Sequence, residues 1–209
     1  MSHDAYNSYF TVFQLPQHLN LDVVALEKQF YALSRRLHPD RFAAKPASEQ
    51  EAALTASSHL NDAYRTLKDP ILRTQYLLKL EGVELEEQSK AATDAARATG
   101  EQKKQVVPPE LLEEAFELNM QLQEMRAAKQ MGEDEPELRR DLMTAKDAFD
   151  AKMVEMQAEL EALWSAWDAG VDAEDKTAKG RAKEAMVELL NKRSYLRNLV
   201  RDVNDALGL

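Results

Sequence analysis

A long run of apolar residues at helical spacing constrains the fold of this chain more than any other feature of its sequence. Between about residues 137 and 169, apolar side chains recur every three or four positions, which lines one face of a helix. They are Leu138, Leu142, Ala145, Phe149, Met156, Leu160, Leu163 and Trp167. At a rise of about 1.5 Å per residue, this helix would be roughly 50 Å long. Such a stripe must be buried against partner helices.

Two more helices with apolar seams flank the long one in the sequence. The earlier seam holds Leu111, Ala115, Leu118, Leu122 and Met125, and the later one holds Met186, Leu189, Leu196, Val200, Val203 and Leu207. We expect Gly170 to end the long helix. The start of the last helix stays open, because Asp172 is a good cap while Gly180 weakens the first turns. An elongated, antiparallel three-helix bundle over residues 108–209 buries all three seams. Trp164 and Trp167 are expected to fill its far end.

Residues 1–82 predict a smaller helical domain built on an antiparallel helix hairpin. The first helix of the hairpin covers residues 21–37, with Asn20 as its N-cap. The second begins at a capping box, Ser48–Glu51, in which hydroxyl and carboxylate satisfy backbone donors reciprocally. Its apolar stripe comprises Ala53, Ala56, Leu60, Ala63 and Leu67.

Prolines and a glycine separate the elements of this domain. Pro39 stops the first helix and favours an extended backbone at His38, because the helical region is disfavoured before proline. Asp69-Pro70 ends the second helix and opens a third, with Asp as N-cap and Pro at the first helical position. Gly82 is a suitable stop for that third helix. Residues 83–107 are rich in Ala, Gln and charge, and predict a mobile linker.

Composition agrees with an all-α fold and excludes several kinds of site. The chain is rich in strong helix formers and has no cysteine, which excludes disulfides, thiolate metal sites and a cysteine nucleophile. The net charge of −10 disfavours general binding to nucleic acid or anionic membranes. The charge is uneven: residues 1–80 hold nine Lys and Arg against eight Asp and Glu, whereas residues 81–209 hold 18 against 29. With Lys28 as the first cation and no apolar span, we expect a cytoplasmic protein.

One short motif stands out, His38-Pro39-Asp40, in the loop of the predicted hairpin. Lys28, Arg35 and Arg36 lead into it, and helical spacing turns these cations away from the core. Cations at a helix C-terminus also favour the macrodipole whatever the function. A metal site at His38 and Asp40 would need further ligands, of which only His59 is available nearby. A Ser34–His38–Asp40 triad would need a pocket and oxyanion donors that the sequence does not announce.

The helix near residues 110–130 carries a second apolar stripe beside its core seam. Leu112, Phe116 and Met120 are displaced from that seam by about 140°, at 100° per residue. Two interpretations remain open. Either the helix is central and buried on two sides, or it exposes an apolar patch for a partner.

Five segments of the chain resemble a known family. Tyr9–Pro16 (YFTVFQLP), the helix end Arg35–Leu37 and the following His38–Phe42 (HPDRF) resemble a J-domain. Pro70–Leu78 (PILRTQYLL) and Lys192–Leu199 (KRSYLRNL) are similar to the HscB branch, the co-chaperones of iron–sulfur cluster assembly. The likeness extends over nearly the whole chain.

The sequence departs from that branch in three places. The linker is longer than in compact bacterial members, an apparent insertion lies near residues 170–182, and the N-terminal cysteine motif of many eukaryotic relatives is missing.

The resemblance implies a co-chaperone that performs no bond chemistry itself and needs no cofactor. Such a protein binds the cluster scaffold IscU, delivers it to the DnaK-like chaperone HscA and stimulates that chaperone's ATPase. The chaperone-binding residues it implies are His38, Pro39, Asp40, Lys28, Arg35, Arg36 and Arg41. The scaffold-binding residues it implies are Leu112, Phe116, Tyr195, Glu113 and Met120. In this arrangement Pro39 fixes the backbone, Asp40 offers an acceptor to an arginine, and the cations steer docking onto an acidic surface.

Two alternatives compete with this interpretation. The chain could be a general J-protein for other DnaK clients, although no Gly/Phe-rich segment or cysteine repeat follows residue 82. It could also be a structural helical protein in which the His-Pro-Asp triplet is accidental.

Overall fold

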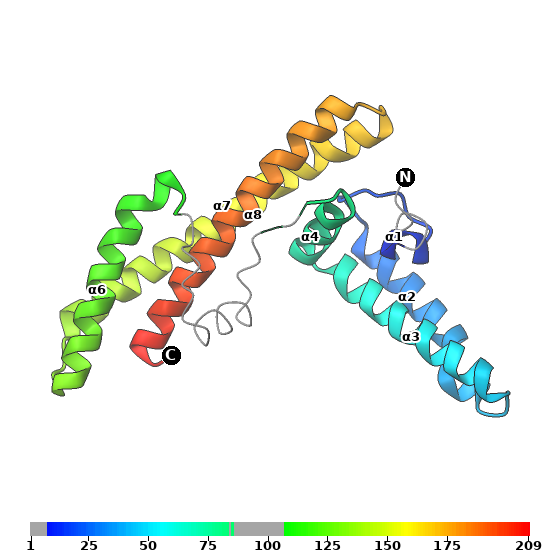
Figure 1. The fold of residues 1–209 in the computed structure, drawn as a ribbon, viewed down its shortest axis with the longest axis horizontal. Coiled ribbons are helices and arrows are strands. Elements are labelled where there is room, and N and C mark those ends of the chain that lie inside the picture. Colours follow the sequence, from blue (N-terminus) through cyan, green and yellow to red (C-terminus); the bar gives the residue numbers. More distant parts are fainter. Residues whose placement is uncertain (1–7, 84, 86–106) are drawn as a thin grey trace. The chain divides into compact units, whose positions relative to one another are not determined.

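The computed structural model of the chain describes residues 8–83, 85 and 107–209. Within those residues every regular element is helical (Figure 1), as the sequence predicts. In chain order the elements are α1 (Tyr9–Val12), α2 (Val23–Leu37), the 3-10 helix η2 (Pro39–Phe42), α3 (Ala47–Lys68), α4 (Pro70–Leu80), the 3-10 helix η3 (Pro109–Leu111), α6 (Leu112–Met131), α7 (Pro136–Asp172) and α8 (Lys176–Leu207). None of these helices has the length and apolar character that crossing a bilayer requires.

Packing divides the described residues into two compact units that do not follow the order of the sequence. Unit 1 contains residues 8–83, 85 and 161–184, and unit 2 contains residues 107–160 and 185–209. The end of α7 and the beginning of α8 therefore belong with the N-terminal helices. Domain limits at residues 1–82 and 108–209 remain a prediction about which parts fold independently. The predicted linker lies outside the described residues over 86–106.

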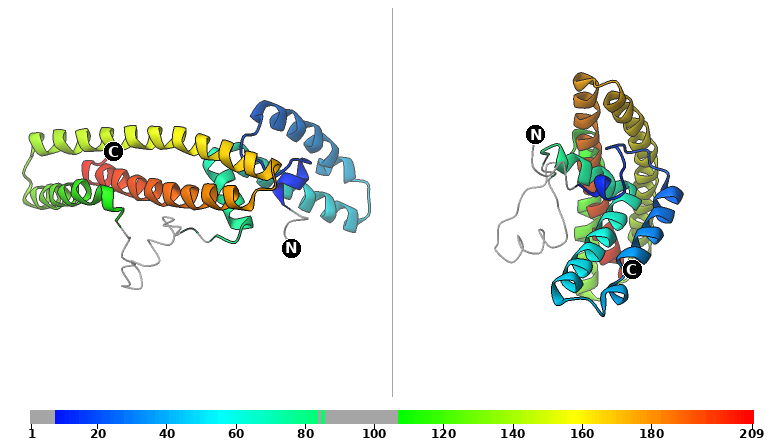
Figure 2. Two further views of the ribbon diagram at one scale, coloured as in Figure 1. Left: turned by 90° about the horizontal axis from the view of Figure 1, so that it is seen from above. Right: turned by 90° about the vertical axis from the view of Figure 1, so that its right-hand side faces the viewer.

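In unit 1, α2 and α3 form the predicted hairpin, with η2 in the connection between them (Figure 2). Its start differs from the sequence prediction. Asp22, not Asn20, is the N-cap of α2, and its Oδ1 accepts the Ala25 N–H at 2.9 Å. Asn20 does not cap because its side chain is engaged elsewhere, donating to Asp168 at 3.0 Å. A tertiary contact has displaced the local one.

The predicted capping box of α3 is also wrong. The helix begins at Ala47 with Pro46 at the N-cap, and no side chain caps it. The ring of Pro46 fixes its φ angle, and the helix begins at the next residue. Ser48 therefore already lies inside the first turn. Gln50 instead donates through Nε2 to the carbonyl oxygens of Ala43 and Lys45, at 3.3 and 2.8 Å. These bonds tie the connecting loop to α3.

The remaining boundary predictions in this region are confirmed. Asp69 caps α4, with Oδ1 accepting the Leu72 N–H at 2.8 Å, and Pro70 is the first helical residue. Gly82 follows the end of α4 with φ of +78°, a left-handed backbone that favours glycine. The core of unit 1 includes Phe10, Phe13, Leu19, Leu26, Leu60, Leu67, Leu77, Leu78, Trp164 and Trp167.

The turn between α7 and α8 corrects one further prediction and shows where α8 begins. Gly170 does not end α7, which continues to Asp172, and α8 is capped by Asp175 rather than Asp172. Glycine at position 170 serves close packing instead. A Cβ placed there would lie 3.0 Å from Lys179 Cγ and 3.2 Å from Lys179 N, so a larger residue would push α8 away.

The two tryptophans of α7 lie in unit 1 and have partners that the sequence did not predict. Trp164 donates from Nε1 to Thr74 Oγ1 at 2.9 Å, and Trp167 donates to the Gln17 carbonyl at 3.0 Å. The indole of Trp164 also stacks under the guanidinium of Arg73, with a 5.0 Å distance to the ring centroid. They pack against N-terminal segments instead of filling the end of a three-helix bundle.

Unit 2 contains η3 and α6 with parts of α7 and α8, and polar contacts join these segments. Lys152 on α7 pairs with Glu114 on α6. Lys192 on α8 pairs with Glu110 of η3 at 3.1 Å, and Arg139 on α7 donates to the Leu207 carbonyl at 3.3 Å. The apolar seams predicted from the sequence form the core, with Leu118, Leu122, Leu142, Phe149, Met186, Leu196 and Val203 buried.

Candidate functional site

The His38-Pro39-Asp40 loop is held outward where α2 ends. His38 has φ of −59° and ψ of +127°, the extended backbone predicted for a residue before proline. Pro39 then starts η2, so the chain reverses within one short helical turn. The side chains of His38 and Asp40 are 55% and 88% exposed. The loop therefore presents both polar groups to solvent.

His38 and Asp40 contact each other in two ways. His38 Nδ1 lies 3.3 Å from the Asp40 N–H, which it accepts when that nitrogen is unprotonated, and 3.4 Å from Asp40 Oδ2. The second contact becomes an ion pair only when the imidazole is protonated. Both distances are long, and both groups remain available to a partner.

Arg41 fastens the loop to the end of α2. Its backbone N–H donates to the His38 carbonyl at 3.0 Å, and its guanidinium Nη1 donates to the Arg35 carbonyl at 3.4 Å. The second bond satisfies a carbonyl of the last turn of α2, which has no partner within the helix. Arg41 thus supports the loop shape while remaining exposed.

The predicted chaperone-binding cations form a solvent-exposed basic surface. Lys28, Arg35, Arg36 and Arg41 are all exposed, and none forms an ion pair with a carboxylate of a described residue. Glu27, the one acidic residue within α2, is turned toward α3, where it accepts from the Tyr64 hydroxyl at 3.0 Å and lies 3.9 Å from Lys68 Nζ. Tyr64 and, secondarily, Glu27 raise the pKa of Lys68. Because Glu27 faces α3, the outer face of α2 keeps its positive charge.

Two exposed apolar residues on this face were not predicted. Val24 and Tyr31 are 62% and 55% exposed. With Lys28 and Arg35 they follow a 24, 28, 31, 35 spacing, which places all four along one stripe of α2. That spacing is present in the sequence, on a face of the helix away from the core seam. We call these four residues the α2 stripe.

In unit 2, α6 exposes its second apolar stripe. Leu112, Phe116 and Met120 are 57%, 66% and 59% exposed, while the core seam of the same helix is buried. The structure therefore agrees with an exposed patch, not with a helix buried on two sides. Glu113 and Glu117 are exposed beside it. We call Leu112, Phe116 and Met120 the α6 patch.

Tyr195 is not brought to the surface with the α6 patch. It lies in the core of unit 2 on α8 and is 5% exposed. Burial, assisted by the nearby charge of Asp202, raises the pKa of its hydroxyl. A partner can touch little of this side chain, so a contribution to binding from Tyr195 would act through packing. Its role as a scaffold-binding residue remains a prediction.

Metal binding by the described residues would need three or four converging ligands. No group of three or more His, Asp and Glu side chains among them is arranged to hold a metal ion. His59 lies on α3, 5.4 Å from the ring of Tyr9, and so packs in an aromatic contact of its own.

Comparison with solved structures identifies the fold. Chaperone HscB from Vibrio cholerae matches with a TM-score of 0.53 and 27% identity, over 96% of this chain and 99% of that one. Human co-chaperone protein HscB matches with a TM-score of 0.56 and 22% identity, over 97% of this chain and 83% of that one. No family model matches the chain. The chain has the fold of the HscB co-chaperones over nearly its full length, as the sequence resemblance implied.

Proposed function

We propose that this HscB-like protein is an adaptor with two binding surfaces: a basic loop-and-helix surface that engages a DnaK-like chaperone of the HscA type, and an apolar helix face that binds an iron–sulfur scaffold of the IscU type. The protein stimulates ATP hydrolysis by its chaperone partner and delivers the scaffold to it. The observation that carries this proposal is the exposed His38-Pro39-Asp40 loop at the end of an unpaired basic face.

The chemistry of the loop and α2 suits a partner with an acidic surface. The cations Lys28, Arg35 and Arg36 attract it over a distance of about 8 Å at physiological salt. Asp40 supplies an exposed carboxylate that an arginine of the partner can meet in a charge-assisted hydrogen bond. Binding of this kind favours one conformation of the chaperone and so changes the rate of its ATP hydrolysis.

The α6 patch suits a partner with an apolar surface and a basic rim. Leu112, Phe116 and Met120 offer adjacent apolar side chains on one helix face, a common mode of helix recognition. Glu113 and Glu117 border these side chains and would pair with cations of the scaffold. Neither surface includes a group that must react.

The test is single-turnover ATPase activity of a DnaK-like chaperone, measured with this protein and with or without an IscU-type scaffold. We expect stimulation by the protein, further enhancement by the scaffold, and loss of stimulation in His38→Gln. Arg140→Gln, an exposed cation on α7, is the matched control and should behave as wild type. Stimulation that the scaffold does not enhance would instead favour a general J-protein. No stimulation by folded protein would reject a chaperone role.

A further inference from the structure

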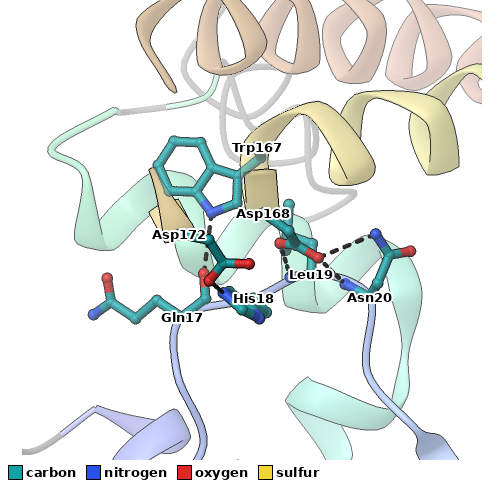
Figure 3. Close-up of polar contacts among 7 residues, drawn as sticks. All are labelled: Gln17, His18, Leu19, Asn20, Trp167, Asp168 and Asp172. Carbon is teal, nitrogen blue, oxygen red and sulfur yellow. Dashed lines mark hydrogen bonds and ion pairs between the residues drawn. The ribbon is translucent and has the colours of Figure 1, made fainter. Parts of the chain in front are cut away.

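The segment that leads into α2 is fastened to the end of α7 by side chains from one face of that helix (Figure 3). Asp168 accepts the Leu19 N–H through Oδ1 at 2.7 Å and the Asn20 N–H through Oδ2 at 2.9 Å. The Asn20 side chain adds a third bond to Oδ2 at 3.0 Å. One carboxylate thereby satisfies two consecutive backbone donors and a side-chain amide.

Neighbouring residues on α7 hold the same segment at the two preceding residues, Gln17 and His18. Trp167 donates from its indole to the Gln17 carbonyl at 3.0 Å, and Asp172 lies 3.0 Å from His18 Nε2 through Oδ1. Asp172 is 70% exposed on its side chain, so its contact is weaker than that of Asp168. Trp167 and Asp168 are adjacent on α7, and Asp172 lies one turn after Asp168. Of these three residues, Asp168 makes the most bonds to the segment.

These bonds lie immediately before the helix that carries the proposed docking surface. Leu19 is fully buried in the core of unit 1, and Asp22, three residues on, caps α2. The α2 stripe begins only two residues after that cap. Fixing the backbone at Leu19 and Asn20 therefore fixes where α2 starts and which way it points.

A second attachment joins the same part of α7 to α4. Arg73 is buried, donates from Nη1 to the Leu67 carbonyl at 2.5 Å and lies against Trp164. Burial lowers its pKa, while the negative charges of Asp69 and Asp168 act in the opposite direction. Asp168 thus also provides part of the charge that compensates a buried guanidinium. Removing this carboxylate affects both attachments.

We propose that Asp168 is a positioning residue for docking: it holds the Leu19–Asn20 backbone and thereby sets the orientation of α2 toward the chaperone. The working J-like unit is then made from two distant stretches of sequence, residues 8–83 and 161–184. The effect of Asp168 on the chaperone rests on the function proposed above, whereas its effect on the Leu19–Asn20 backbone does not.

The first arm of the test is amide hydrogen exchange in the full-length protein. Charge-assisted bonds predict that the Leu19 and Asn20 amides of Asp168→Asn exchange about ten- to a hundredfold faster than in the wild type. An asparagine retains one acceptor but turns a donor toward an N–H. Asp172→Asn, which alters only the contact to His18, is the matched control and should leave both amides unchanged.

The second arm measures stimulation of the chaperone at a series of protein concentrations. Asp168→Asn should raise the concentration needed for half-maximal stimulation several-fold and leave the maximal rate unchanged, because the His38 loop is intact. Asp168→Glu, which keeps both carboxylate oxygens, should restore part of the loss. A purely structural role would change exchange and leave the half-maximal concentration as in the wild type.

The outcomes separate this proposal from the proposed function. Unchanged exchange at Leu19 and Asn20 in Asp168→Asn overturns the positioning role, as does faster exchange with an unchanged half-maximal concentration. If wild-type protein fails to stimulate the chaperone, the proposed function fails, and the exchange arm still decides whether Asp168 holds the backbone. If Asp168→Asn does not fold, Asp168→Glu decides: its longer side chain displaces both carboxylate oxygens, so the Leu19 and Asn20 amides should still exchange faster than in the wild type, and unchanged exchange overturns the proposal.

Discussion

The two candidate binding surfaces are built in opposite ways. In unit 1 the surface is a charged loop and helix face, kept in shape by polar bonds to Arg41, Gln50 and Asp168. In unit 2 it is an apolar stripe on a regular helix whose other face forms the core. A polar surface of the first kind depends on many precise contacts, whereas the second depends on little beyond helix periodicity. Substitutions near the two surfaces should therefore have different consequences.

The largest effect should come from the loop of unit 1. His38→Gln is expected to abolish stimulation of the chaperone while leaving scaffold binding and thermal stability unchanged, because the side chain is mostly exposed. Single-turnover ATPase assays and a scaffold-binding titration measure the two properties side by side. A parallel loss of scaffold binding would contradict the assignment of separate surfaces.

A double substitution tests the α6 patch against the core beneath it. Leu112→Ala with Phe116→Ala should weaken scaffold binding by roughly 2 kcal/mol or more, about thirtyfold, if these residues are central to the interface. Stability should change by only about 0.5 kcal/mol per site, since both side chains are exposed.

Two matched controls bracket this result in thermal melts and binding titrations. Leu118→Ala, which truncates a buried residue of the same helix, should cost about 2–5 kcal/mol of stability. Val154→Ala truncates a 74% exposed residue on α7 and should affect neither property. A large loss of stability in the double variant would place the α6 patch in the core.

Salt should weaken binding at the two surfaces to different extents, and this difference should be smaller than the effects of the substitutions above. Raising ionic strength from about 0.05 M to 0.5 M screens the exposed cations of α2 and should weaken chaperone docking several-fold. Scaffold binding through the α6 patch should change less, because its main contacts are apolar. Equal salt dependence of the two titrations would contradict the comparison.

The smallest effect should be a pH dependence of stability that arises at Asp175, in the turn before α8. Hydrogen bonds from the Ala178 and Thr177 backbones lower the pKa of Asp175. A folded-state pKa below the unfolded one stabilises the protein above the unfolded pKa of about 3.9, and this contribution is lost as pH falls through the folded value. Asp175→Asn should therefore lower the melting temperature slightly at pH 7, and that difference should shrink as pH falls below the unfolded pKa and vanish below the folded one. A difference that persists in acid would assign the effect to another cause.

Local patterns in the sequence predicted most of the helices and both surfaces. The spacing of apolar residues identified α6, α7 and α8. Asp69-Pro70 marked a boundary because the Asp69 carboxylate caps a backbone N–H only three residues on, and no distant partner competes for that bond. The second apolar stripe of α6 allowed two interpretations, and the exposure of Leu112 and Phe116 agrees with one of them. Their role in binding, like that of the loop residues, remains a prediction.

Tertiary contacts account for several of the failures, whereas the capping box of α3 failed because Pro46 starts the helix earlier. Asn20 has the side chain of an N-cap, yet Asp168, 148 residues away, accepts its hydrogen bond. Gly170 resembles a helix stop, yet the approach of Lys179 is what requires a glycine there. In each case the deciding partner lies in a segment that no local pattern identifies.

The composition of unit 1 from two distant stretches has a consequence during synthesis. A nascent chain released from the ribosome as far as residue 85 already contains the His38 loop and every cation of α2, but lacks Trp164, Trp167 and Asp168. The last pieces of the unit emerge only when translation has passed residue 184. The order of translation itself thus delays completion of the docking unit until most of the α6 to α8 region, the α6 patch included, has been made.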